Sequence, residues 1–139
     1  MLFRSGDGFL AHDLYDVASL FRLGWPHVDA GRQARMTTAL GAMLDWCLSS
    51  VVGPDGSVKV DVGDDSVETA TYFAVGLLGE LGVFDPAKRF WTTRDIPGGP
   101  ALGHRLAMRI RDELAHGGGA EGGTYYRNAL ERLAGDGVH

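Results

Sequence analysis

The sequence lacks several features that would point to a particular class of protein. Its 139 residues hold one cysteine, Cys47, which excludes an intrachain disulfide and a thiolate metal site. No apolar run is long enough to cross a bilayer. Lys and Arg number 13 against 18 for Asp and Glu, and basic residues cluster no further than the pair Lys88-Arg89. We therefore expect no nucleic-acid partner and no membrane span.

Glycine, by contrast, is frequent, with 21 residues. The run GGGAEGG at 117–123 predicts a flexible loop. The length is that of one domain. The first five residues, MLFRS, match what the end of a common sequencing adapter would encode, so we expect residues 1–5 to be non-native. Residues 6–139 would then be part of a domain that continues upstream. Localisation stays open on that basis, with the cytoplasm favoured.

Helix signals are strong and strand signals weak. Apolar residues recur at spacings of three and four, which is typical of amphipathic helices. We expect helices at about 13–23, 30–50, 66–81, 101–116 and 124–133, with Gly24 as a left-handed stop and a helical turn at Asp85-Pro86. The predicted fold class is all-α, built of antiparallel helical hairpins.

The expected helix at 66–81 differs from its neighbours. One stripe runs from Val67 to Leu81, and Tyr72, Val75 and Gly76 make the opposite side apolar or small as well. Such a helix is enclosed by protein. The helices before and after it are half polar, so enclosed helices alternate with helices that expose one side to solvent. That order, together with a faint repeat of about fifty to sixty residues, predicts inner and outer layers of stacked helical hairpins.

The segment LDWCLSSVVGPDGSVKVDVGDDSVETATYFAVGLLGELG, residues 44–82, resembles a repeat of the α/α-toroid superfamily, in particular of squalene-cyclase and prenyltransferase-like proteins. In those repeats an outer helix ends in an Asp-Gly-Ser turn, and a short crossing leads to a capped inner helix. Val58 stands here where the family usually has an aromatic residue. The resemblance implies an arc of an α/α toroid, with about two and a half hairpins in this chain. Six-hairpin glycosidases and polysaccharide lyases share that architecture.

Four aspartates between residues 55 and 65 allow two interpretations. In the first they are structural: Asp55 forms a turn with Gly56, and Asp65 with Glu68 forms a capping box. That interpretation leaves Asp61 and Asp64 unexplained. In the second, the crossing lies at the rim of a toroid cavity, where desolvation and mutual repulsion raise the pKa of one carboxyl.

The second interpretation predicts a site at the rim. Class II terpene cyclases take their acid from an Asp-x-Asp-Asp motif, and the stretch at 61–65 is one residue longer. A glycosidase-like pair would instead combine this crossing with the first helix. The predicted catalytic residues are Asp64 and Asp61, and the predicted substrate-binding residues are Tyr72, Asp65, His12 and Asp16.

We expect no metal and no cofactor. The calcium-loop pattern counted from Asp55 fails at Lys59, and no histidine pair has the spacing of a zinc-binding helix. Cys47 falls in an apolar stripe and is expected to be buried and inert.

Three functions remain open: a terpenoid-type enzyme, a glycan-type enzyme, and a non-catalytic toroid that binds a ligand or partner. The expected partners are a small molecule or glycan, and either missing hairpins of the same chain or a second copy of it.

Overall fold

The computed structural model describes residues 11–60, 66–117 and 120–138, and over this range it confirms the all-α prediction. The described residues form no named strand, and the β-type pairing among them is a single bridge between Val52 and Val58. The helices are α1 (Ala11–Gly24), α2 (Ala30–Ser50), α3 (Val67–Glu80), α4 (Gly99–Ala115) and α5 (Ala120–Gly135), with 3-10 turns η1 (Trp25–His27) and η2 (Pro86–Lys88).

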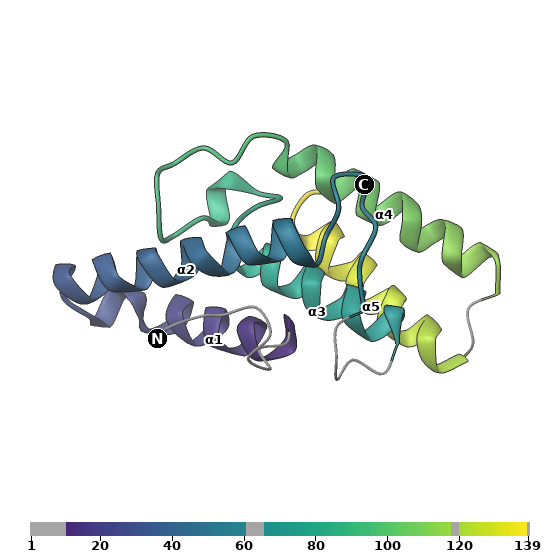
Figure 1. Cartoon of the computed structure of the whole chain (residues 1–139), viewed down its shortest axis with the longest axis horizontal. Helices are drawn as coiled ribbons and strands as arrows, with labels where there is room; N and C mark the ends of the chain where they lie inside the picture. The colour runs from purple at the N-terminus through teal and green to yellow at the C-terminus, as the bar shows by residue number, and fades with distance from the viewer. Residues whose placement is uncertain (1–10, 61–65, 118–119, 139) are drawn as a thin grey trace.

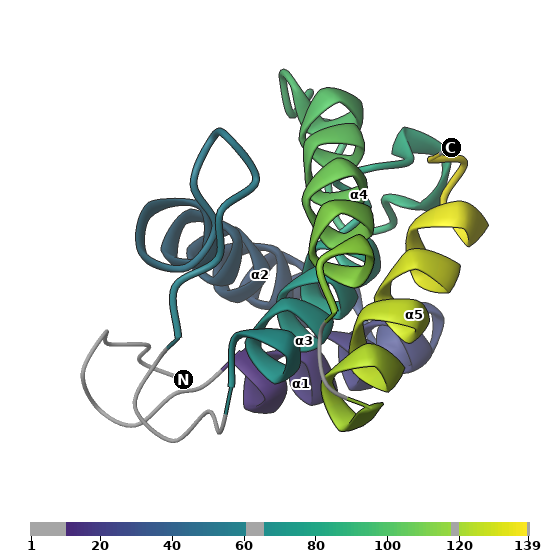
Figure 2. The same cartoon turned by 90° about the vertical axis from the view of Figure 1, so that its right-hand side faces the viewer.

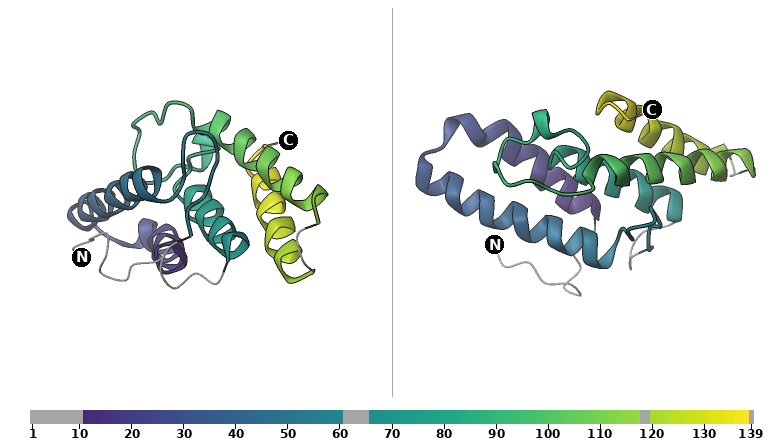
Figure 3. Two further views of the ribbon diagram at one scale, coloured as in Figure 1. Left: turned by 45° about the vertical axis from the view of Figure 1, so that its right-hand side comes forward. Right: turned by 90° about the horizontal axis from the view of Figure 1, so that it is seen from above.

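Helices α1, α3 and α5 form one layer and α2 and α4 a second (Figure 3). The central helix α3 packs mainly against α1 on one side and α5 on the other. The colour gradient in Figure 1 shows that α1, α3 and α5 run in one direction, whereas α2 and α4 run back. Figure 2 shows α4 crossing in front of α3, with α5 beside it. Successive helices therefore run in opposite directions, and the closest packing is that of α3 with α1 and α5.

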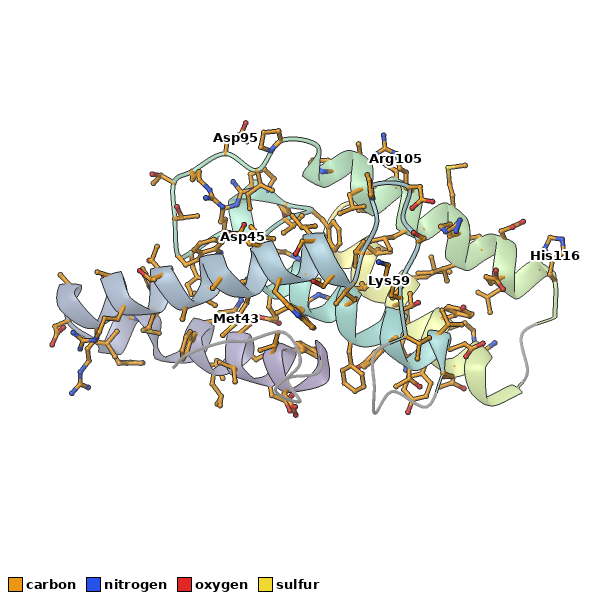
Figure 4. All side chains as sticks on the ribbon, viewed as in Figure 1. Met43, Asp45, Lys59, Asp95, Arg105 and His116 are labelled. Atoms are coloured by element: carbon orange, nitrogen blue, oxygen red, sulfur yellow. The ribbon has the colours of Figure 1, made fainter. Side chains whose placement is uncertain are left out.

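Burial sets α3 apart from the other helices. Helix α3 is buried over almost its whole length after Thr69, as expected for an enclosed helix. Helix α2 is amphipathic: Met43 is fully buried on the side that faces α1, and Asp45 lies exposed on another side (Figure 4). The core joins side chains of all five helices, with the three leucines Leu77, Leu78 and Leu81 at its centre.

Two helix ends differ from the prediction. Gly24 has φ −82°, so it is not a left-handed stop, and the chain continues directly into η1. The side chain of Gln33 donates to the Trp25 carbonyl there (2.9 Å), which helps to hold that turn. Helix α5 begins at Ala120, so the second half of the glycine run is helical. Packing of α5 against α3 outweighs the low helix propensity of glycine.

The cap of α3 is also corrected. The N-cap is Ser66, whose hydroxyl accepts from the Thr69 backbone N–H (3.2 Å), so the capping box predicted one residue earlier is wrong. A serine hydroxyl satisfies this backbone donor as well as an aspartate does, so composition alone does not separate the two positions. The cap at Asp85 is confirmed by its hydrogen bond to the Ala87 N–H (3.0 Å).

The turn between α2 and α3 is as predicted. Asp55 Oδ1 accepts from the backbone N–H (3.0 Å) and the hydroxyl (2.6 Å) of Ser57. Gly56 adopts φ +84°, and a Cβ there would lie 2.9 Å from the backbone of Arg105. Glycine is therefore required for this turn to pack against α4.

The long segment between α3 and α4 is fastened by its aromatic residues, as expected. Trp91 is buried and its indole donates to the Leu81 carbonyl (2.8 Å). Phe90 packs edge-on against Trp25 and lies under the guanidinium of Arg22. This segment therefore covers the ends of α1 and α3.

Candidate functional site

The predicted acids at Asp61, Asp64 and Asp65 lie outside the described residues. His12 lies in the first turn of α1, and its side chain is likewise outside the described part. Asp16 is exposed on α1, and Tyr72 is half-buried on α3. These two residues belong to neighbouring helices of one layer. Tyr72 lines the cleft on the surface of that layer, and Asp16 does not.

That surface contains a cleft of about 350 Å³. Its lining comes only from α1, α3 and α5, so it belongs to the side of this layer that α2 and α4 leave uncovered. The lining residues are Tyr15, Tyr72, Gly76, Asn128, Glu131 and Arg132. We call this the layer cleft.

Close helix packing shapes the floor of the layer cleft. A Cβ at Gly76 would lie 2.9 Å from the ring of Tyr15. Because Gly76 has no side chain, Tyr15 of α1 can lie directly against α3. The sequence shows an apolar helix containing glycine, but the tyrosine that fills the space comes from a residue more than sixty positions away in the printed chain.

Aromatic rings form one end of the layer cleft. The ring centroid of Tyr72 lies 5.6 Å from that of Tyr125 and 5.1 Å from that of Phe73. Tyr15 lies 6.3 Å from Phe73. Burial raises the pKa of Tyr15, and the nearby Arg132 acts in the opposite direction. The phenol of Tyr15 is therefore neutral and able to donate a hydrogen bond at ordinary pH.

Charged groups form the other end. Glu80 at the end of α3 receives Arg22 Nε of α1 at its Oε2 (2.7 Å) and faces Arg132 Nη1 of α5 from its Oε1 (3.1 Å). Arg132 Nε lies 3.7 Å from Asp136 Oδ2, and Lys88 Nζ lies 2.6 Å from Asp136 Oδ1. We call this alternating series the ion-pair chain. It ties α1, α3, α5 and η2 together.

The ion-pair chain also stabilises helix ends. Arg22 Nη2 donates to the carbonyl of Glu80 (2.5 Å), and Lys88 Nζ donates to the carbonyl of Gly135 (2.7 Å). Cations are favourable at helix C-termini, where the last carbonyls have no partner within the helix. The ion-pair chain therefore holds the Arg132 side chain in place, with its guanidinium at the layer cleft.

Two atoms of the ion-pair chain are buried without a hydrogen bond. They are Arg132 Nε and Asp136 Oδ2, the two that face each other at 3.7 Å. Gly79 of α3 is packed against them, since a Cβ there would lie 2.6 Å from Arg132 Nε and 2.9 Å from Asp136 Oδ2. The pair is electrostatic in character and sits directly on the backbone of α3.

The layer cleft offers recognition groups and no carboxylate pair. Glu131 is the one carboxylate among its lining residues, and Glu80 behind it is already engaged by two arginines. Within the described residues no three His, Cys, Asp or Glu side chains gather in a way that could hold a metal ion. No helix in the described part of the chain is long and apolar enough to cross a membrane.

Two smaller hollows lie on the other side of the layer. One, of about 170 Å³, is bounded by the 56–58 turn, α3, α4 and Tyr126 of α5. The other, of about 260 Å³, lies between the end of α2 and the start of α4 and includes Ile96. Both are separated from the layer cleft by the bodies of α3 and α5.

Of the predicted site residues, Tyr72 lines the layer cleft, and the other lining residues were not predicted. Glu80 is a charged residue at the end of an otherwise apolar helix, and that position could have been recognised as the site of an ion pair. Its partners Arg22 and Arg132 lie on other helices, and no local pattern identifies them.

Comparisons with known proteins add no family to this description. No protein-family model matches the chain, and neither a curated protein nor a solved structure matches it.

Proposed function

We propose that this chain is an arc of stacked helical hairpins of the α/α-toroid kind, and that its α1–α3–α5 face binds a glycan. The alternation of α1, α3 and α5 with α2 and α4 in two layers supports the arc. In this proposal the layer that contains the enclosed helix α3 is the inner one, so the layer cleft would open into the central space.

The observation that carries the glycan proposal is the composition of the layer cleft. Two tyrosine rings, Tyr15 and Tyr72, lie beside the amide of Asn128, the carboxylate of Glu131 and the guanidinium of Arg132. A sugar ring presents C–H groups on its faces and hydroxyls at its edge. Aromatic surface suits the faces, and the amide, carboxylate and guanidinium supply acceptors and donors for the hydroxyls.

The ion-pair chain supports the same proposal through preorganisation. Because Glu80 and Asp136 hold Arg132, its side chain does not have to be ordered when a ligand binds. Avoiding that loss of freedom favours binding. A neutral oligosaccharide fits best, since the ion-pair chain has three cations and two anions and Glu131 offsets its one net positive charge.

The catalytic alternatives stay predictions. Both a glycan-type and a terpenoid-type enzyme would use Asp64 or Asp61 as an acid, and these residues lie outside the described part. If Asp64 acts, Asp64→Asn should abolish turnover while leaving oligosaccharide binding at the cleft intact. A catalytic role is refuted if a measurable turnover survives that substitution unchanged.

The binding test uses a panel of neutral hexose oligosaccharides and ring signals of ¹³C-labelled tyrosine. The chain has four tyrosines. Tyr15 and Tyr72 line the layer cleft, Tyr125 contacts Tyr72, and Tyr126 is buried on the other side of α5. A ligand in the cleft should shift the first three signals and leave that of Tyr126 in place.

Substitutions sharpen the test. Asn128 and Glu131 are exposed on α5, so Asn128→Ala and Glu131→Ala should leave the fold intact. Each should weaken binding by about two- to tenfold, since each removes hydrogen bonds to the ligand. Arg127→Ala is the matched control, because Arg127 is equally exposed on α5 and does not line the cleft. Equal affinities in all three variants, or shifts that include Tyr126 alone, would refute the proposal.

The arc also predicts contacts beyond the described residues. Leu20 and Leu23 are 67% and 71% exposed on α1, and Met108 is 67% exposed on α4. In this proposal they meet further hairpins of the same chain or a second copy. Sedimentation of this chain should show self-association that Leu20→Ser with Leu23→Ser reduces; a strictly monomeric chain at high concentration would contradict this part.

A further inference from the structure

The hollow of about 170 Å³ between the two layers has a composition unlike that of the layer cleft. Its inner wall is apolar, formed by Val58 of the turn and by Leu106 and Ile110 of α4. An apolar protein cavity of about 150 Å³ is large enough for a benzene ring. We call this the interlayer cavity, and its size suits one six-membered ring.

Three hydroxyl groups border the interlayer cavity, and that of Ser57 is used within the turn, where it donates to Asp55 Oδ1 (2.6 Å). The hydroxyl of Thr71 is used within α3, where it donates to the Val67 carbonyl (2.7 Å). Tyr126 is only 3% exposed, and among the described residues its hydroxyl has no hydrogen-bond partner. The hydroxyl itself keeps some accessible surface and borders the cavity. A ligand in the cavity can therefore form a hydrogen bond with it.

Charges at the mouth of the interlayer cavity are predominantly negative. Glu113 and Asp112 of α4 line it. Burial raises the pKa of Tyr126, and the nearby carboxylates of Glu68 and Glu113 raise it further. The cation at the mouth is Arg109. The pKa of Asp55 is lowered mainly by the Ser57 hydroxyl, and Arg109 is close enough to contribute to this shift. His116 lies 3.5 Å from Asp112. With Arg109 offset by Asp55, the remaining carboxylates favour a positively charged ligand.

We infer that the interlayer cavity binds a small protonated amine carried on a six-membered ring. The ring packs against Val58, Leu106 and Ile110. The ammonium group faces the carboxylate of Glu113 and donates a hydrogen bond to the hydroxyl of Tyr126. This site is independent of the layer cleft, because α3 and α5 separate the two and no residue lines both.

The isoleucines make a direct test possible. The chain has two, Ile96 and Ile110. Ile110 lines the interlayer cavity, and Ile96 lines the neighbouring hollow at the start of α4. Titration of the ¹³C-methyl-isoleucine protein with benzylamine should shift the Ile110 signal and leave the Ile96 signal in place.

Ring analogues and two variants test the chemistry. Benzyl alcohol should bind about tenfold more weakly than benzylamine, and benzoate should not shift Ile110, since a hydrogen bond to a charged group is the stronger kind. Tyr126→Phe keeps the ring and removes the hydroxyl, and Glu113→Gln removes one charge from an exposed residue. Each substitution should weaken the binding of benzylamine by about tenfold, whereas Glu131→Gln on the other side of α5 should leave its affinity unchanged.

Three results would overturn the inference. They are an Ile110 signal that does not respond to millimolar benzylamine, benzoate binding as strongly as benzylamine, and unchanged benzylamine affinity in both Tyr126→Phe and Glu113→Gln. The oligosaccharide titration reports on tyrosines of the layer cleft, so failure of one site is distinguishable from failure of the other.

Discussion

The substitution Gly79→Ala tests how tightly the ion-pair chain is packed on α3. An added methyl group would lie 2.6 Å from Arg132 Nε, 2.9 Å from Arg132 Nη2 and 2.9 Å from Asp136 Oδ2. All three distances are shorter than a carbon atom tolerates. Neither side chain is free to withdraw, because Glu80 holds Arg132 and Lys88 holds Asp136.

The expected magnitude is a balance of three effects. Alanine in place of glycine within a helix favours folding by about 1 kcal/mol. Overpacking at a close contact costs about 1–3 kcal/mol. Displacing Arg132 from Glu80 adds less than about 1 kcal/mol, since the arginine side chain is 30% exposed and water screens the pair. The free energy of unfolding should therefore fall, by up to about 3 kcal/mol.

Urea unfolding measures this change, and Gly24→Ala is the matched control. No atom lies within 4 Å of a Cβ at Gly24, and its φ of −82° suits alanine. That substitution should raise stability by up to about 1 kcal/mol. The two variants should thus change in opposite directions. If Gly79→Ala is as stable as Gly24→Ala, Arg132 does not lie against α3 as described, and its role in the layer cleft is wrong as well.

Three further predictions concern single residues. Ser66→Ala should lower the free energy of unfolding by about 1 kcal/mol in urea, because it removes the cap on α3; an unchanged value would contradict the Thr69 hydrogen bond. Burial raises the pKa of Cys47 to about 12, so its thiol should resist a disulfide reagent at pH 8 until the protein unfolds, and rapid reaction of the folded chain would contradict that burial. The hydrogen bond to the Asp112 carbonyl, with the nearby carboxylate, raises the pKa of His116 above its usual 6.5. Its contribution to stability is therefore present below the unfolded pKa and is lost as pH rises through the folded one; an NMR titration should show the raised pKa and its fall in Asp112→Asn.

The helices were predictable where local signals agree. Helix α2 has the predicted bounds 30–50, because Asp29 caps its start and one apolar stripe runs through it. Helix α5 begins earlier than predicted, since glycines at its start indicate a loop when read locally, whereas contact with α3 stabilises them as helix. The prediction of a left-handed stop at Gly24 was wrong for a related reason, because glycine permits that conformation but does not require it.

The site was predictable only in part. Tyr72 was predicted as a binding residue because it lies near the start of an enclosed helix, and position along one helix is a local property. The partners of Glu80 are not local: Arg22 is 58 residues away in the chain and Arg132 lies on another helix. Only the packing of α1 and α5 against α3 brings these charges together.

The enclosed helix α3 explains why both candidate sites exist. A helix in contact with protein on nearly every side must accommodate neighbours closely, and glycine at positions 76 and 79 does so on the side of the layer cleft. There the neighbours are Tyr15 and Arg132, so a recognition surface arises from packing itself. On the opposite side Thr71 borders the interlayer cavity together with the 56–58 turn and residues of α4. The same helix therefore separates an aromatic, charge-balanced surface from an apolar, acidic one, so the two proposed ligands would not compete for one site.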